Sequence, residues 1–188
     1  MKLTSLSYTR ISSAWGAIGV AWQEADEGSM ICRIYLPNET IPGEAEVHAI
    51  HAERVCSSHA AIAEWGKRLQ AYMEGEIADF PLDRIALEVC SEFQQKVLLA
   101  QFGVPRGRVS TYGGIARALG IRGGARAVGG ALSRNPFPIL IPCHRTVRSD
   151  GGLGGFRGGL EMKRALLQLE GVKFSPKGKV PVDRIWEG

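Results

Sequence analysis

Two short helical segments separated by a glycine-bearing turn constrain the fold of this chain most strongly. Residues 110–120 (STYGGIARALG) and 124–135 (GARAVGGALSRN) each have room for about three helical turns, and Pro136 stops the second segment. This is the pattern of a helix-turn-helix, although many helical hairpins share it. A local run of arginines raises the case for nucleic-acid binding: Arg117, Arg122, Arg126 and Arg134.

The second of these segments has almost no side-chain bulk. Its small residues are Ala125, Ala127, Gly129, Gly130 and Ala131. Interior glycine costs roughly 1 kcal/mol relative to alanine, so another surface is expected to approach this backbone closely. A tightly packed neighbouring helix and the groove of a nucleic acid both fit this expectation.

Charge is divided unevenly along the chain. Residues 1–90 carry 7 Lys and Arg against 13 Asp and Glu, whereas residues 91–188 carry 16 against 6. This asymmetry predicts two domains, the second of which faces a polyanion, although a solvated basic surface would give the same counts. We expect domains at residues 1–84 and 85–174, followed by a loose tail at 175–188.

The first domain is predicted to be α/β. Residues 14–23 and 31–37 have the apolar patterns of strands, and residues 60–73 repeat apolar side chains at helical spacing. Residues 77–83 are expected to form an extended linker, because Pro81 keeps its predecessor out of helical geometry.

The second domain is predicted to be mainly helical. Ser91 and Gln94 have the spacing of a capping box at the start of one helix, and Gly171 is placed to end another. Between these helices, residues 149–159 contain six glycines but lack the spacing of a phosphate-binding loop. We therefore expect a mobile loop there rather than a nucleotide site.

Composition excludes several classes of protein. A content of 45% hydrophobic and 22% charged residues is typical of globular proteins. No apolar run approaches the roughly 20 residues of a membrane helix, and the N-terminus lacks the apolar core of a signal peptide. The cysteines show no CxxC spacing, so reduced thiols in a cytoplasmic protein are expected: Cys32, Cys56, Cys90 and Cys143.

The segment IPCHRTV (141–147) places Cys143 directly before His144 at the end of an apolar run. His144, Arg145 and Arg148 are expected to lower the pKa of the thiol and to favour the reactive thiolate. A packed thiol, a metal ligand and a nucleophile all fit this position, although a metal would need further ligands at suitable spacing. Adjacent residues of an extended segment point to opposite faces, so His144 would act on the sulfur through a bound water.

Glu170 lies at the C-terminal end of its predicted helix, where the helix dipole disfavours a carboxylate by roughly 0.3 to 1 kcal/mol. A partner elsewhere in the fold would explain this position. A solvated glutamate that tolerates the small cost would explain it equally well.

Together these residues resemble the O6-alkylguanine-DNA alkyltransferase family of direct-reversal DNA repair proteins. The resemblance covers about residues 60–174 and depends on RAVG, NP, PCHR and LEG in this order, whereas residues 1–59 match weakly. It implies an α/β, ribonuclease H-like N-terminal domain. It also implies a mainly α C-terminal domain with a winged helix-turn-helix-like DNA-binding motif.

The resemblance implies roles for the residues singled out above. Cys143 would accept the alkyl group of O6-alkylguanine, and more weakly of O4-alkylthymine, in a single irreversible turnover. His144 would take the thiol proton through a water, and Glu170 would orient His144. Asn135 would brace the turn that holds this network, and Tyr112 would contact a DNA phosphate and assist the departing guanine oxygen.

The resemblance also implies a DNA-binding surface and a substrate pocket. Arg126 would fill the gap left by a flipped nucleotide in alkylated double-stranded DNA, and its helix would lie in the minor groove. The implied DNA-binding residues are Tyr112, Ala125, Arg126, Ala127, Gly129 and Arg134. The implied pocket residues are Val147, Phe156, Arg157 and Lys163, of which Phe156 stands where the family often has tyrosine.

Two other functions compete with the transferase. Alkyltransferase-like proteins bind lesions but replace the cysteine, commonly with tryptophan, whereas this chain keeps Cys143. A cysteine hydrolase would turn over through an acyl intermediate. We expect a monomer without a cofactor and without a metal, because the family's N-terminal zinc ligands cannot be matched to Cys32, Cys56, His48, His51 or His59.

Overall fold

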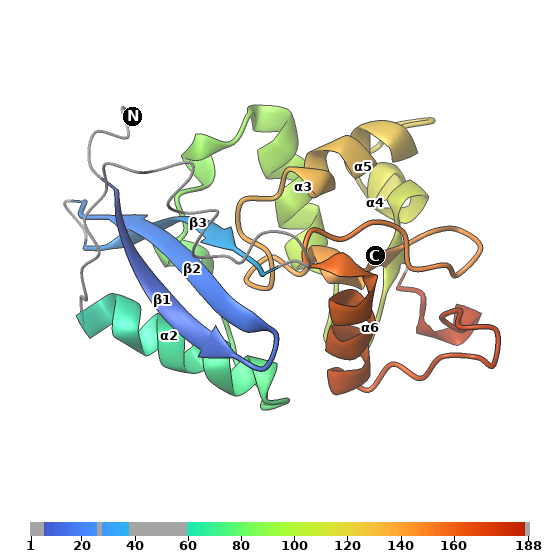
Figure 1. The fold of residues 1–188 in the computed structure, drawn as a ribbon. Helices are drawn as coiled ribbons and strands as arrows, with labels where there is room; N and C mark the ends of the chain where they lie inside the picture. Colours follow the sequence, from blue (N-terminus) through green and yellow to red (C-terminus); the bar gives the residue numbers. More distant parts are fainter. Residues whose placement is uncertain (1–5, 26–27, 38–59, 187–188) are drawn as a thin grey trace. The chain divides into compact units, whose positions relative to one another are not determined.

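The computed structural model describes residues 6–25, 28–37 and 60–186 (Figure 1), and the chain divides into two compact units between Val89 and Cys90. The domain boundary expected after residue 84 lies shortly before this division. The possible metal ligands Cys56, His48, His51 and His59 lie outside the described residues. Among the helices of residues 6–25, 28–37 and 60–186, none is long and apolar enough to cross a membrane.

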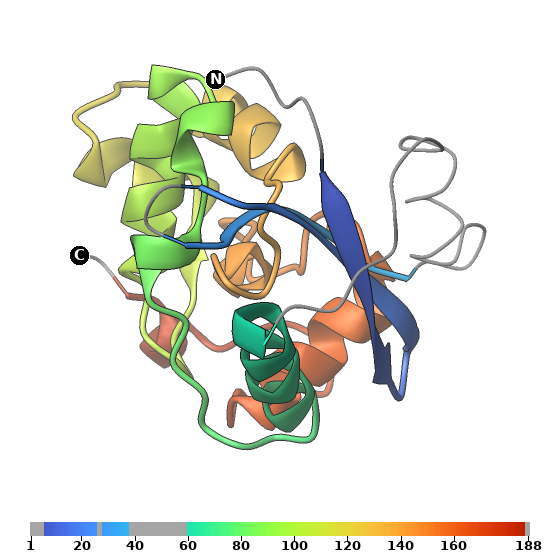
Figure 2. The same ribbon diagram turned by 90° about the vertical axis from the view of Figure 1, so that its left-hand side faces the viewer.

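The first unit is a three-stranded antiparallel sheet with a helix packed on it. Its strands β1 (Ser7–Ser13), β2 (Gly16–Gln23) and β3 (Met30–Tyr35) are neighbours in chain order. Helix α2 (Ala60–Met73) lies against β1, as Figures 1 and 2 show. The α/β prediction for this part is confirmed. Strand β1 was missed because its short alternating pattern is weak, with Tyr8 and Ile11 its buried residues.

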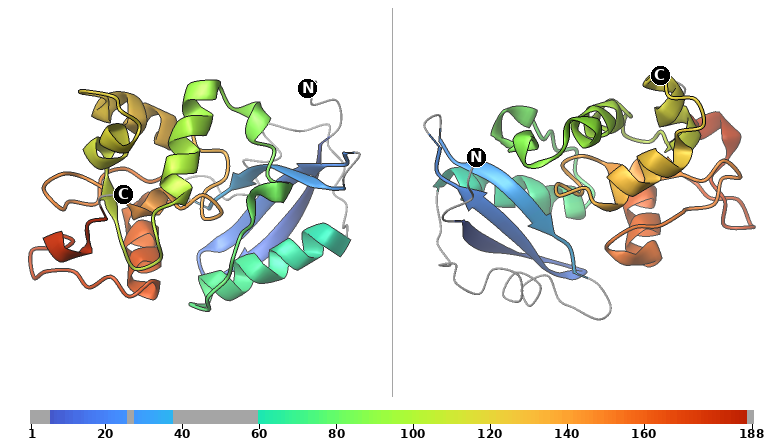
Figure 3. Two further views of the ribbon diagram at one scale, coloured as in Figure 1. Left: turned by 180° about the vertical axis from the view of Figure 1, so that it is seen from behind. Right: turned by 90° about the horizontal axis from the view of Figure 1, so that it is seen from above.

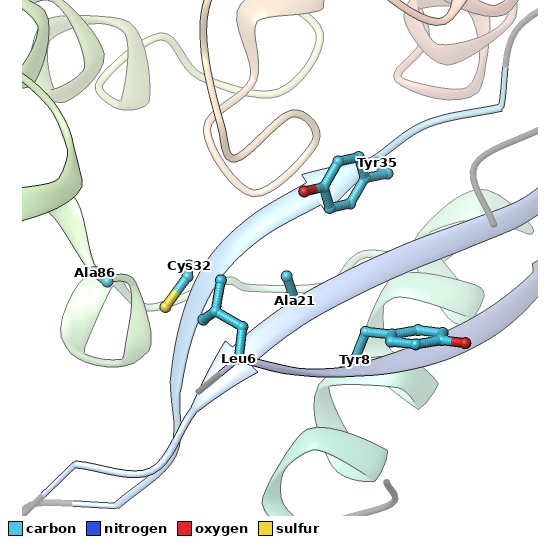
Figure 4. Packing of buried hydrophobic residues seen from close by; sticks show 6 residues of the cluster. All are labelled: Leu6, Tyr8, Ala21, Cys32, Tyr35 and Ala86. Atoms are coloured by element: carbon cyan, nitrogen blue, oxygen red, sulfur yellow. The ribbon is translucent and has the colours of Figure 1, made fainter. Parts of the chain in front are cut away.

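Buried side chains fix the first unit on both sides of β3. Figure 4 shows the Cys32 sulfur directed toward Ala86, within a cluster that also contains Leu6, Tyr8, Ala21 and Tyr35. The extended linker expected at residues 77–83 is instead part of this unit. Phe80 is buried and stacks on Trp65 at a ring-centroid distance of 5.9 Å. Removing the apolar ring from water and stacking it on a second ring stabilise this arrangement.

The second unit is mainly helical, as predicted. Helices α4 (Tyr112–Ala118) and α5 (Ala125–Ser133) form the helix-turn-helix pair and pack on α3 (Glu92–Phe102), as Figure 3 shows from two sides. A short parallel ladder joins β4 (Ser110–Thr111) to β5 (Thr146–Val147), and α6 (Gly159–Leu169) follows.

The start of α3 forms only half of the predicted capping box. The Ser91 side chain accepts a hydrogen bond from the Gln94 backbone N–H at 3.4 Å. The Gln94 side chain does not return to Ser91 but donates to the carbonyls of Ala131, at 3.1 Å, and Arg134, at 3.0 Å. The last carbonyls of a helix have no partner within it, so Gln94 satisfies the end of α5 instead.

The prediction of a loose tail at 175–188 is wrong for its described residues. Val180 and Ile185 pack with Val109 in the second core, and Val109 donates its N–H to the Arg184 carbonyl at 2.9 Å. The apolar side chains of this segment pack beside α6 and complete this core. The sequence did not predict this packing, because the segment is short and rich in Lys and Pro.

Replacing Val180 with alanine is therefore expected to destabilise the second unit by roughly 1 to 3 kcal/mol, through lost burial and the cavity left behind. Hydrogen exchange of the α6 amides under native conditions would report this loss. The exposed Lys177 in the same segment gives the matched control, since Lys177→Ala should leave exchange nearly unchanged. Equal protection in both variants would contradict the packing described here.

Candidate active site

Cys143 begins a tight turn rather than ending a strand. The preceding apolar run is irregular, with Ile139 at a φ of 73°, and Cys143–Arg145 forms a single 3-10 turn. The extended geometry assumed for Cys143 and His144 is therefore wrong. The turn leaves Cys143 partly exposed while His144 is fully buried.

Cys143 lies on the wall of a cavity of about 340 Å³. Five of the predicted site residues share this wall: Tyr112, Gly129, Asn135, Phe156 and Arg157. The remainder of the lining is formed by Leu132, Ser133, Pro138 and Gly155. The structure thus brings together residues from α4, α5, the cysteine turn and the glycine-rich loop, at a size suited to a small organic group.

Two predicted pocket residues do not line this cavity. Val147 is fully buried in the second core. Lys163 is also fully buried, and its Nζ donates to the carbonyls of Thr146 at 2.6 Å, Gly155 at 3.2 Å and Leu153. These bonds hold the glycine-rich loop against the cysteine turn, which restrains the segment expected to be mobile.

Asn135 fixes the irregular apolar run that precedes Cys143 in the chain. Its Nδ2 donates to the Ile141 carbonyl at 3.0 Å, and its Oδ1 accepts from the Phe137 N–H at 2.9 Å. A buried amide with both ends satisfied fixes a backbone that has no regular secondary structure of its own.

A buried ion-pair network lies behind the cysteine turn. His144 Nε2 and Glu170 Oε1 are 3.0 Å apart, and Arg145 contacts the same carboxylate through Nε at 2.9 Å and Nη2 at 2.8 Å. These partners hold the pKa of Glu170 well below its usual range against the opposing effect of burial. Glu170 is therefore no solvated surface residue, and it is charged.

Arg145 is the member of this network that the sequence did not reveal. It was expected to act on the cysteine, whereas its guanidinium binds Glu170 and also donates to the Val104 carbonyl at 2.7 Å. The only available signal was a carboxylate placed unfavourably at a helix C-terminus, which indicated a partner but not its identity.

Burial raises the pKa of the Cys143 thiol, so the prediction of a lowered pKa is wrong. Several groups oppose the burial without outweighing it: the Asn135 side chain, which hydrogen-bonds the sulfur, the Lys163 ammonium, and the backbone of Cys143 and His144. Arg148 does not stabilise the thiolate of Cys143, because its side chain is 67% exposed and lies beside Asp150.

His144 carries no charge at neutral pH, since burial lowers its pKa despite the nearby Glu170. A neutral imidazole can accept a proton, which an imidazolium cannot. Beside a thiol that remains protonated, the pair His144–Glu170 therefore supplies a base and a negative charge that would stabilise the resulting cation.

Tyr112 faces the glycine-rich loop across the cavity. Burial raises the pKa of its phenol, and the neighbouring Cys143 acts in the same direction, so the hydroxyl keeps its proton. A Cβ added to Gly154 would lie 2.8 Å from that hydroxyl, and the φ of Gly154 is +69°. Only glycine fits here, and it lets the loop approach the phenol closely.

The small residues of α5 have different surroundings along the helix. Ala131 is buried against the other helices, whereas Ala125 and Ala127 are exposed beside the exposed side chain of Arg126. Tight packing inside the protein accounts for Ala131 but not for the exposed pair. Arg134 is also exposed, at the C-terminal end of the helix.

No cluster of three or more His, Cys, Asp or Glu side chains that could hold a metal ion occurs in the part of the chain that the structure describes.

Comparison with known proteins identifies relatives of this chain. Residues 92–172 match the DNA-binding domain of 6-O-methylguanine DNA methyltransferase. The methylated-DNA--protein-cysteine methyltransferase of Methanothermobacter thermautotrophicus is 44% identical over 106 residues, which are 56% of this chain and 59% of that protein. Its counterpart in Mycobacterium leprae is 45% identical over 113 residues, covering 60% of this chain and 67% of that protein.

Solved structures extend the similarity over nearly the whole chain. The Mycobacterium tuberculosis O6-methylguanine methyltransferase superposes with a TM-score of 0.70 at 31% identity, covering 95% of this chain and 96% of that one. The Mycobacterium tuberculosis OGT in complex with DNA gives a TM-score of 0.71 at 32% identity, over 87% and 92% of the two chains. The sequence matches thus span about three fifths to two thirds of the relatives, and the structural matches span more than nine tenths.

The buried network leads to a pH-dependent prediction. Glu170→Gln should destabilise the protein by about 2 to 4 kcal/mol at pH 7, because it leaves the Arg145 charge without its buried partner. A depressed pKa stabilises the folded state above the unfolded value of about 4.3, and this contribution is lost as the pH falls toward the folded value. The gap between wild type and variant, measured by urea denaturation, should therefore narrow below about pH 4.

Asp150→Asn provides the control for this prediction. Asp150 also pairs with a cation, since Lys179 Nζ lies 3.1 Å from its carboxylate, but both side chains are exposed. Its loss should leave stability nearly unchanged at every pH. A Glu170→Gln variant as stable as Asp150→Asn at neutral pH would contradict the structural importance of the buried network.

Proposed function

We propose that Cys143 is the alkyl acceptor, because this chain belongs to the methylated-DNA--protein-cysteine methyltransferase family. Proteins of this family repair O6-methylguanine in DNA by alkyl transfer to a cysteine of the protein itself. The observation that carries this assignment is the position of Cys143 on the cavity wall, directly before the buried His144. Cys32 and Cys90, the other cysteines that the structure describes, are buried and do not line this cavity.

The first step is removal of the thiol proton. The Cys143 thiol is protonated at rest, so a base must act when the substrate is bound. Because His144 Nε2 is hydrogen-bonded to Glu170, the thiol proton passes through a water to the other ring nitrogen, Nδ1. The charge of Glu170, held by Arg145, stabilises the imidazolium that forms.

The second step is transfer of the alkyl group. The sulfur attacks the saturated carbon on O6 of guanine, a C–S bond forms, and the C–O6 bond breaks with its electrons passing to the guanine oxygen. The Tyr112 hydroxyl keeps its proton and can donate to that oxygen as negative charge develops. The proton lost by the thiol is finally gained by guanine, so the products are restored guanine and a thioether.

A thioether cannot be hydrolysed as an acyl-thioester can. Water would have to displace the thiolate from a saturated carbon, without the carbonyl group that makes a thioester reactive, so the cysteine is not regenerated. Each protein molecule therefore reacts once, with O6-alkylguanine as the main substrate and O4-alkylthymine as a weaker one.

The substrate reaches Cys143 as a base flipped out of double-stranded DNA. The exposed Ala125 and Ala127 leave α5 narrow enough to enter a minor groove, and the exposed Arg126 takes the place of the flipped base. Phe156 and Arg157, on the cavity wall, set which alkyl groups fit. We expect a monomer that acts wherever the cell keeps its DNA, in the cytoplasm or in a nucleus.

The decisive experiment is mass spectrometry of the intact protein and its peptides after incubation with a duplex that contains one O6-methylguanine. We expect one methyl group on the Cys143 peptide, saturating at one per protein, with guanine restored in the duplex. Cys143→Ala should abolish transfer and still bind the duplex, whereas Cys90→Ala should react as wild type does. Tight lesion binding by a protein whose Cys143 stays unmodified would assign lesion recognition instead.

Base flipping predicts a difference between two substrates. Arg126→Ala should slow transfer from the duplex by about ten- to a hundred-fold, because nothing then fills the gap in the stack, and should slow transfer from a single-stranded oligonucleotide much less. Single-turnover rates at saturating substrate would measure both effects. Arg117→Ala, which removes another exposed arginine, should show no such difference, and an equal loss on both substrates for Arg126→Ala would exclude the gap-filling role.

A further inference from the structure

Gln101 is a polar side chain in an otherwise apolar part of α3. It is fully buried, as are Val97 and Leu98 on the same helix. Burying an amide without hydrogen bonds costs several kcal/mol, on the order of 2 to 7, so both ends of this side chain need partners. Nothing in the helix pattern requires glutamine here, since an apolar residue would fill the same space.

The two partners of Gln101 flank the cysteine turn, Cys143–Arg145. Its Nε2 donates to the Pro142 carbonyl at 2.8 Å, and its Oε1 accepts from the Thr146 hydroxyl. The orientation of the amide follows from chemistry, because a carbonyl can only accept and therefore requires the NH₂ group. A single side chain thus spans the residue before Cys143 and the residue after Arg145.

The two ends of the turn are held from other directions as well. The Pro142 carbonyl also accepts from the Arg145 N–H at 2.9 Å, which closes the turn itself. The Thr146 carbonyl accepts from Lys163 Nζ at 2.6 Å. Gln101 differs from these contacts because it connects the two ends to each other through one rigid planar group.

We propose that Gln101 is a positioning residue for alkyl transfer, and that it fixes the direction in which Cys143 presents its sulfur to the cavity. The proposal extends the assignment of Cys143 as acceptor and rests on it. Displacement at a saturated carbon requires the sulfur to approach in line with the breaking C–O bond, and a misplacement of about 1 Å can cost roughly a hundred-fold in rate. Asn135 fixes the run before the turn, whereas Gln101 fixes the turn itself.

The first test is Gln101→Met, which keeps the length of the side chain and removes both hydrogen bonds. The single-turnover rate of methyl transfer at saturating O6-methylguanine duplex should fall by about ten- to a hundred-fold. The affinity for the same duplex, measured with Cys143→Ser as background, should stay within about twofold, because Gln101 does not face the DNA.

Gln95→Met is the matched control. Gln95 lies on the same helix and also donates its Nε2 to a backbone carbonyl, that of Cys90, at 2.9 Å. This bond joins α3 to the residues just before it rather than to the cysteine turn, so its loss tests the general effect of removing a glutamine from α3. Gln95→Met should transfer methyl groups at the wild-type rate.

Gln101→Glu separates positioning from simple packing. A protonated carboxyl group can donate to Pro142 and accept from Thr146, as the amide does, whereas a carboxylate can only accept. Burial raises the pKa of a carboxyl group, so the acid form is populated as the pH falls. The ratio of the variant rate to the wild-type rate should therefore rise toward one at lower pH, while the ratio for Gln101→Met should stay flat.

Thr146→Val gives a second route should Gln101→Met fail to fold. It removes the hydroxyl with little change of shape, and it should slow transfer without weakening duplex binding. Wild-type rates in Gln101→Met, a loss of rate matched by loss of duplex affinity, or an equally slow Gln95→Met would each overturn the positioning role. A wild-type protein that never methylates Cys143 would instead refute the acceptor assignment.

Discussion

The second unit depends on one buried carboxylate. Glu170 lies at the end of α6 and contacts His144 and Arg145 of the cysteine turn, while Arg145 continues to the Val104 carbonyl beyond α3. A buried charge is costly unless it is paired and fully hydrogen-bonded, so these segments hold their relative positions only while all partners are present. Under the proposed mechanism, the interaction that assembles the site is therefore the same one that prepares its base.

Two physical effects compete at the Cys143 sulfur. Burial favours the neutral thiol, while the Asn135 hydrogen bond and the Lys163 ammonium favour the thiolate, and burial is the larger effect. A permanently ionised cysteine would react with many electrophiles and oxidants, whereas a protonated one does not. Under the proposed mechanism, reactivity appears only when the bound substrate brings the sulfur, the base and a leaving group together.

The sequence predicts more of the helices than of the site. Periodicity and stop signals placed α2, α4 and α5 correctly, because these depend on local chemistry. The order of short motifs singled out Cys143 as a candidate. It did not predict that Arg145 binds Glu170 or that Gln101 binds the ends of the cysteine turn, because both contacts join residues far apart in the chain. The packing of residues 180–186 was not predicted for a related reason, since their apolar side chains are buried only against a core built from other segments.

Lys163 makes the attachment of the glycine-rich loop dependent on pH. An ammonium has three N–H groups and meets three carbonyls here, those of Thr146, Leu153 and Gly155. Burial lowers the pKa of Lys163 to about 8, and the amine that forms above this pH has only two N–H groups. In alkaline solution one of the three carbonyls therefore loses its donor, which weakens the attachment of the glycine-rich loop to the cysteine turn.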